Sequence, residues 1–216
     1  MKDLIQGYKK FRELVFPKKR KLFRKLADGQ KPKYLFITCC DSRVVPNEFT
    51  QTDAGFMFVE RSIGNLVPYP SAGENEAVAA VEYAVKALGI TRIIICGHTE
   101  CGAMKAILNP DSLDGMPIVR AWLKNAEETR RVVAEKHGDK TGDALLEAAI
   151  RENVRIQVAN AKRIPCVAEL ANEGRLEIHG WVFDFARGEV DVLDETSDTV
   201  VALEHYRAGD DHQLNA

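Results

Sequence analysis

Two short, almost purely apolar segments constrain the fold of this chain more than any other feature. Residues 33–38 read KYLFIT, and residues 92–96 read RIIIC. A continuous apolar run of this length is typical of a strand buried on both faces, as central strands of a parallel sheet are. Both segments are therefore predicted to be central parallel strands.

The residues around these two segments predict further strands and long helices. A third strand is expected at 56–60 (FMFVE), and helices are expected at 72–88, 118–137 and 143–162. Ser71 to Gly73 looks like the start of the first of these helices, and Gly89 should end it.

The two ends of the chain add an arm and a strand pair. Residues 2–28 carry apolar side chains at helical spacing and are interrupted by Pro17, which predicts two amphipathic helical pieces forming an arm. Residues 176–185 alternate in polarity, Arg187–Gly188 forms a turn, and residues 189–193 return as a second strand.

Together these patterns predict an α/β fold. We expect a mostly parallel central sheet flanked by helices, with an N-terminal helical arm at residues 1–28 and a C-terminal strand pair. With 216 residues, 45% of them hydrophobic, the chain is large enough for one substantial core. A single domain spanning 1–216 is therefore expected.

Composition narrows the classes of function. The formal net charge of −2 gives no electrostatic case for a nucleic-acid partner, so a small-molecule partner is expected. No apolar run approaches the ~20 residues that span a bilayer, and the N-terminus lacks the apolar stretch of a secretory signal, so we expect a cytoplasmic protein without membrane contact. Five cysteines, an odd number, fit metal or thiol chemistry better than a disulfide framework.

Metal-ligating residue types follow both central strands directly. Cys39 comes after the first, and His98 and Cys101 come after the second. Because ligands of an α/β sheet bind at the carboxyl ends of its strands, these three residues are expected to meet there. Two cysteines and one histidine leave one zinc position open for water, which is the mark of a catalytic site. Cys101 should also begin a helix, whose positive end favours a thiolate.

Asp41 and Arg43 stand beside the first cysteine for a physical reason. Two thiolates cancel the charge of Zn2+, so the metal acidifies water less than an all-histidine site does. Asp41 can accept a hydrogen bond and a proton from that water, while Arg43 can form a bidentate fork with Asp41 and keep it ionised.

These motifs resemble those of the β-carbonic anhydrases. Residues 39–43 (CCDSR) match the C-x-D-S-R signature of that family, and residues 98–102 (HTECG) match its H-x-x-C-G signature. The resemblance implies one zinc per subunit, held by Cys39, His98 and Cys101, an Asp41–Arg43 pair, and reversible hydration of carbon dioxide to bicarbonate. It also implies a homodimer or a higher even multiple, with the N-terminal arm embracing a partner and the active site near the subunit boundary.

Finer matches point to the plant-like branch of the family and to a substrate pocket. Phe36 stands where the bicarbonate-regulated branch has tryptophan, so an open metal is expected. By resemblance, the substrate-binding residues are Gln30, Phe58, Ile63, Tyr83 and Gly102. Ser62 and Ala103 depart from the usual residues of the family and bear on the shape of this pocket.

Two alternatives to carbon dioxide hydration stay open at this level. Carbonyl sulfide and carbon disulfide are linear analogues of carbon dioxide, and related family members hydrolyse them at the same kind of site. A non-catalytic zinc scaffold or redox sensor, in which Cys39 and Cys40 are oxidised and release the metal, is the other hypothesis.

Overall fold

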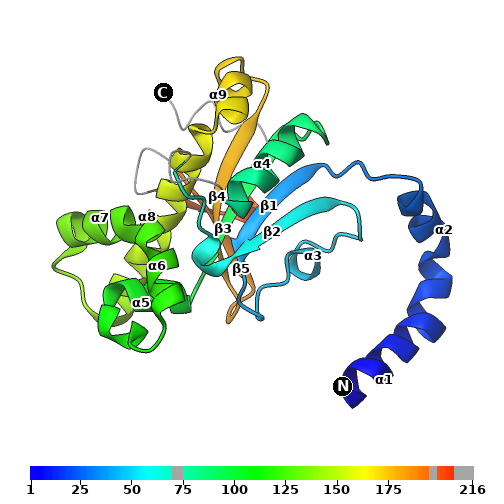
Figure 1. The fold of residues 1–216 in the computed structure, drawn as a ribbon, viewed down its shortest axis with the longest axis horizontal. Helices are drawn as coiled ribbons and strands as arrows, with labels where there is room; N and C mark the ends of the chain where they lie inside the picture. Colours follow the sequence, from blue (N-terminus) through cyan, green and yellow to red (C-terminus); the bar gives the residue numbers. More distant parts are fainter. Residues whose placement is uncertain (70–74, 195–198, 207–216) are drawn as a thin grey trace.

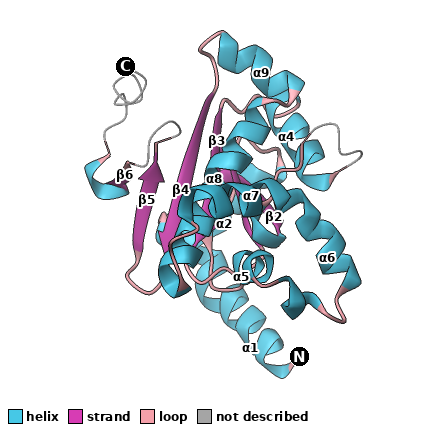
Figure 2. Cartoon of the chain, turned by 90° about the vertical axis from the view of Figure 1, so that its left-hand side faces the viewer, coloured by secondary structure: helices cyan, strands magenta, loops and turns pink. Residues whose placement is uncertain are grey.

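The centre of the molecule is a six-stranded sheet with the order β2-β1-β3-β4-β5-β6. The computed structural model describes residues 1–69, 75–194 and 199–206. The strands are β1 (Tyr34–Cys39), β2 (Met57–Ser62), β3 (Arg92–His98), β4 (Glu177–Asp184), β5 (Glu189–Leu193) and β6 (Val200–Ala202). Strands β2, β1, β3 and β4 run parallel, whereas β5 pairs antiparallel with β4, and β6 pairs antiparallel with β5 at the edge of the sheet (Figure 2). The mostly parallel sheet and the C-terminal strand pair are confirmed.

Helices cover the sheet and extend away from it (Figure 1). After β1 they are α3 (Pro46–Phe49), α4 (Glu76–Lys86), α5 (Gly102–Leu108), α6 (Pro117–Leu123), α7 (Glu127–His137), α8 (Gly142–Lys162) and α9 (Pro165–Asn172). No helix in the described ranges is both long enough and apolar enough to cross a lipid bilayer.

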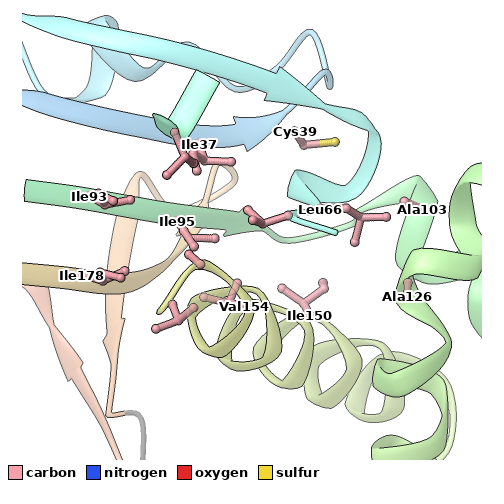
Figure 3. Close-up of a cluster of buried hydrophobic side chains, with 14 of the residues drawn as sticks. Ile37, Cys39, Leu66, Ile93, Ile95, Ala103, Ala126, Ile150, Val154 and Ile178 are labelled. Carbon is pink, nitrogen blue, oxygen red and sulfur yellow. The ribbon is translucent and has the colours of Figure 1, made fainter. Parts of the chain in front are cut away.

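Helix α8 packs so closely on the sheet that two strand positions must be glycine. Val154 of α8 lies against β3 and β4 (Figure 3). A Cβ atom built on Gly97 would lie 2.7 Å from one methyl group of Val154, and one built on Gly180 would lie 2.9 Å from the other. Both distances are shorter than van der Waals contact, so these glycines set how near the longest helix lies to the central strands.

Two helix boundaries differ from those expected. The single helix predicted at 118–137 is wrong, because a 3₁₀ turn at Lys124–Ala126 separates α6 from α7. Leu123, just before this turn, and Ala126, its last residue, are both buried. The predicted start at residues 71–73 lies outside the described residues. The described helix α4 begins at Glu76, where the side chain of Asn75 accepts hydrogen bonds from two backbone amides.

The N-terminal arm is confirmed, but its irregularity is not where Pro17 predicts it. The arm comprises α1 (Lys2–Lys10), a π-helical turn (Phe11–Val15) and α2 (Phe16–Ala27), and it projects from the body of the molecule (Figure 1). Pro17 lies in the first turn of α2, where its missing N–H would have no helical partner in any case. Proline therefore begins the second helix, and the π-helical turn before it is the irregular segment.

Strand β2 buries an acidic residue, Glu60. Its exposed fraction is 8%, and its Oε2 atom has no hydrogen-bond partner among the described residues. Burial, reinforced by the negative charge of Glu76 on α4, raises the pKa of Glu60 to about 7. The folded protein therefore holds this carboxyl group protonated at a pH where the unfolded chain ionises it.

We expect the stability difference between the Glu60→Gln variant and wild type to depend on pH. The ordinary pKa of 4.5 lies below the folded value of about 7, so the native state binds the extra proton and wild-type stability falls as the pH rises through that window. The difference in unfolding free energy, Glu60→Gln minus wild type, should therefore increase by about 3 kcal/mol between pH 4.5 and pH 8. Urea denaturation at both pH values measures this, with the exposed Glu82→Gln as control; a difference that does not change with pH contradicts it.

Candidate functional site

The three candidate metal ligands meet at the carboxyl ends of β1 and β3. The two strands pair in parallel with Thr38 opposite Cys96, so Cys39 and His98 reach the same edge of the sheet. Cys101 follows three residues later, directly before α5. The ligand atoms of Cys39, His98 and Cys101 all lie within 4.8 Å of one another, and all three residues are buried. Figure 3 shows Cys39 at the end of its strand, beside the segment that carries Leu66.

The histidine is oriented for metal binding through its Nε2 atom. Its Nδ1 atom lies 2.8 Å from the carbonyl oxygen of Thr99, which accepts the proton of that nitrogen and leaves Nε2 with a free lone pair. The side chain of His98 is fully buried, and Nε2 has no hydrogen-bond partner in the part of the chain that the structure describes. A buried nitrogen facing two thiols fits a metal ion.

The two cysteines of this group have an electrostatic setting unlike that of the neighbouring cysteine in β3. A hydrogen bond from the Cys101 thiol lowers the pKa of Cys39 to about 4, and the same contact raises the pKa of Cys101. Further donors to Cys39 Sγ include the Gly64 amide at 3.4 Å. Cys96, by contrast, is fully buried in the core, and burial raises its pKa to about 12. Cys39 is thus favoured as a thiolate, the form that binds zinc.

Asp41 and Arg43 form the expected fork next to the ligands. The guanidinium group of Arg43 donates from Nε to Oδ1 of Asp41 at 2.9 Å and from Nη2 to Oδ2 at 2.7 Å. This fork is the main reason that the pKa of Asp41 lies well below its ordinary value. Oδ2 of Asp41 lies 3.9 Å from Nε2 of His98, so the carboxylate adjoins the ligand group.

A row of polar residues on α8, which the sequence reasoning did not single out, holds the loop behind Cys39. Asn153 donates to the carbonyl of Gly64 at 3.0 Å, Gln157 accepts from the amide of Val67 at 2.8 Å, and Asn160 donates to the carbonyl of Val67 at 3.0 Å. Gln157 also donates to Asn153 at 3.1 Å. The sequence carries a signal for this row, since side-chain amides recur at positions i, i+4 and i+7 of a predicted helix. Buried polar groups need hydrogen-bond partners, so such a spacing indicates contacts with a neighbouring segment.

The expected substrate-binding residues fall into two groups in a single chain. Ile63 and Gly102 adjoin the ligands, since Ile63 precedes the Gly64 amide that contacts Cys39, and Gly102 follows Cys101. Phe58, however, pairs with Leu35 in the amino-terminal half of β1, about 13 Å along the strand from Cys39. The ring of Tyr83 lies 5.9 Å from that of Phe58, and Gln30 precedes β1 altogether. One chain therefore does not bring these last three residues to its own metal group.

Known proteins share both the sequence and the fold. The carbonic anhydrase family profile matches residues 34–190. A carbonic anhydrase from Pseudomonas aeruginosa is 44% identical over 207 residues, which cover 95% of this chain and 93% of that protein. The β-carbonic anhydrase CcaA superposes with a TM-score of 0.91 at 43% identity, covering 94% of this chain and 98% of that one. Tetrameric β-carbonic anhydrases from Sordaria macrospora superpose at 0.72 and 29% identity over 93% and 95%.

The fold and the ligand group define a zinc enzyme of the α/β class, since two cysteines and a histidine leave a coordination position open. The chain belongs to the carbonic anhydrase family, in its β class. Zinc is its metal cofactor, and carbonate dehydratase is its enzyme class.

Substitution of Cys39 should separate a metal ligand from its exposed neighbour. We expect Cys39→Ser to lose most of its bound zinc, because a serine hydroxyl does not ionise near neutral pH as the thiol of Cys39 does. Cys40→Ser, the matched control, should keep about one zinc per subunit, since the Cys40 thiol instead donates to the Arg61 carbonyl at 3.3 Å. Metal content measured by plasma mass spectrometry checks both; full zinc occupancy in Cys39→Ser would remove it from the ligand set.

Proposed function

We propose that this chain catalyses the reversible hydration of carbon dioxide to bicarbonate, with Cys39, His98 and Cys101 holding the zinc ion. The observation that carries the proposal is the convergence of these three buried ligands next to an Asp41–Arg43 fork. Bound zinc supplies Lewis-acid chemistry that lets a water molecule lose its proton near neutral pH. All other parts of the reaction fall to side chains of the protein.

Asp41 is proposed to orient the reacting water and to relay its proton to solvent or buffer. Its Oδ2 atom faces the ligand group, 3.9 Å from His98 Nε2, and the carboxylate stays ionised because Arg43 lowers its pKa. A carboxylate with so low a pKa is a weak base and does not retain a proton. It therefore serves as a hydrogen-bond acceptor that fixes the water, and the proton passes on to solvent or buffer.

The Asp41→Asn variant should keep its zinc and lose most of its activity. Asparagine has nearly the same shape, but its amide is not a base and does not form the charged fork with Arg43. We expect kcat/KM for carbon dioxide hydration at pH 7.5 to fall about 100-fold or more. Stopped-flow measurement with a pH indicator tests this, with the exposed Asp114→Asn as control. Wild-type activity in a zinc-loaded Asp41→Asn preparation would remove Asp41 from the mechanism.

Hydrolysis of carbonyl sulfide or carbon disulfide is the competing enzymatic proposal. The same ligand group and the same carboxylate serve either substrate, since both are linear electrophiles attacked by water. Sulfide release from carbonyl sulfide, measured beside carbon dioxide hydration on one zinc-loaded preparation, separates them. Negligible hydration of carbon dioxide by that preparation would overturn the main proposal.

The geometry gives less support to a redox sensor built on Cys39 and Cys40. The Cys39 thiol contacts Gly64 and Cys101, whereas the Cys40 thiol donates to the carbonyl of Arg61. Neighbouring side chains of an extended segment point to opposite sides. The two sulfur atoms therefore have different surroundings and are not poised to form a disulfide.

We also propose that the active site is completed by a second copy of the chain. Strand β2 is an edge strand, and apolar side chains remain exposed beside it, with 40% of Ile63 and 51% of Tyr83 accessible. The arm likewise exposes Leu4, Tyr8 and Leu14. Tetrameric relatives of the same fold support an assembly of even number.

Antiparallel pairing of β2 with its copy would reunite the divided substrate residues. Such a pairing about a two-fold axis places the amino-terminal half of one β2 beside the carboxyl-terminal half of the other. Phe58 and Tyr83 of one chain would then lie near the ligand group of its partner. In this proposal the substrate pocket belongs to two subunits.

Mixed oligomers test whether Tyr83 acts in the site of the partner. Cys39→Ser and Tyr83→Ala subunits should each form nearly inactive oligomers, but a hybrid dimer contains one site free of both substitutions. Denaturing and refolding an equal mixture with zinc should restore about a quarter of wild-type activity per subunit, because half of the dimers are hybrids with one intact site. Activity no higher than the sum of the two parents would place Tyr83 in its own subunit's site.

A further inference from the structure

Phe185 brings a third strand end to the candidate site. Strand β4 pairs in parallel with β3, with Phe183 opposite His98, so the residues after β4 reach the edge of the sheet where the ligands lie. Phe185 is the first residue beyond β4. Its ring centroid is 4.3 Å from the guanidinium carbon of Arg43 and 6.2 Å from the ring centroid of His98.

Arg43 is held in two different directions, and Phe185 accounts for one of them. In the plane of the guanidinium group, Nε and Nη2 donate to Asp41, and Nη2 also donates to the carbonyl of Glu100 at 3.2 Å. The hydrogen-bonding edge of a guanidinium group is planar, so these bonds leave its faces uncovered. The guanidinium carbon lies over the ring of Phe185, 4.3 Å from its centroid. The hydrogen bonds and this ring contact together restrict the guanidinium group.

This restriction matters because the Arg43 side chain is long and 46% exposed. An exposed arginine loses considerable rotamer freedom when it forms a fork, and water competes for its hydrogen bonds. A ring packed against the guanidinium group reduces that freedom and excludes water from the side it contacts, and the cation–π attraction adds to the stabilisation. The ring therefore favours the one rotamer that directs Asp41 towards the ligand group.

We propose that Phe185 is a positioning residue for the reaction and acts through Arg43. Phe185 stabilises the rotamer of Arg43 that forms the fork with Asp41 and directs this carboxylate towards the metal ligands. The catalytic consequence rests on the proposed function, whereas the effect on Arg43 does not.

A double-mutant cycle measures whether Phe185 acts through Arg43. Phe185→Leu should keep wild-type zinc content and lower kcat/KM for carbon dioxide hydration about fivefold, in keeping with a partly exposed cation–π contact. Phe185→Tyr retains the ring and should stay within about twofold of wild type. In an Arg43→Gln background, Phe185→Leu should change kcat/KM by less than about twofold. An equal loss in both backgrounds, or a loss matched by missing zinc, overturns the proposal.

Chemical modification of Arg43 gives a readout that does not depend on catalysis. Phenylglyoxal reacts with accessible guanidinium groups, and mass spectrometry of the peptide containing Arg43 gives the rate. We expect this rate to rise several-fold in Phe185→Leu and to stay near wild type in Phe185→Tyr, while the rate at Arg120, which pairs with Asp114, is unchanged. An unchanged rate at Arg43 in Phe185→Leu overturns the proposal. If wild type fails to hydrate carbon dioxide, this experiment still decides whether the ring restricts Arg43.

Discussion

The parallel pairing of β1 with β3 is the constraint on which the rest of the site depends. Thr38 lies opposite Cys96, and the Thr38 hydroxyl donates to the Cys96 carbonyl at 3.0 Å, which adds a buried bond to the ladder. Each residue advances a strand by about 3.3 Å, so a slip of one residue in this pairing would move Cys39 by that distance relative to His98. The distance between the first ligand and the other two is therefore fixed by strand register before any metal binds.

The row of amides on α8 extends that control to the loop behind the ligands. Backbone groups of Gly64 and Val67 are buried and would lack partners without Asn153, Gln157 and Asn160. The same loop presents the Gly64 amide to the Cys39 sulfur. A fully bonded buried network is rigid, so a helix about 90 positions further along the chain helps to determine the environment of a metal ligand.

Local electrostatics then separate residues of the same type into different roles. Cys39 and Cys96 are both buried, yet the pKa of Cys39 is lowered to about 4 by a thiol donor, whereas burial raises that of Cys96 to about 12. Asp41 and Glu60 differ in the same way. Arg43 holds Asp41 ionised, whereas burial and the negative charge of Glu76 raise the pKa of Glu60 to about 7.

The sequence by itself determined the parallel strands, the helical arm and the residues of the metal group, because apolar runs, helical periodicity and the two ligand motifs are local patterns. Only the tertiary structure decided the 3₁₀ turn between α6 and α7, the amide row that supports Gly64, and the contact of Phe185 with Arg43. It also divided Phe58 and Tyr83 from the ligand group. These features join residues far apart in the chain, and their positions depend on strand order, register and helix packing, which no local pattern specifies.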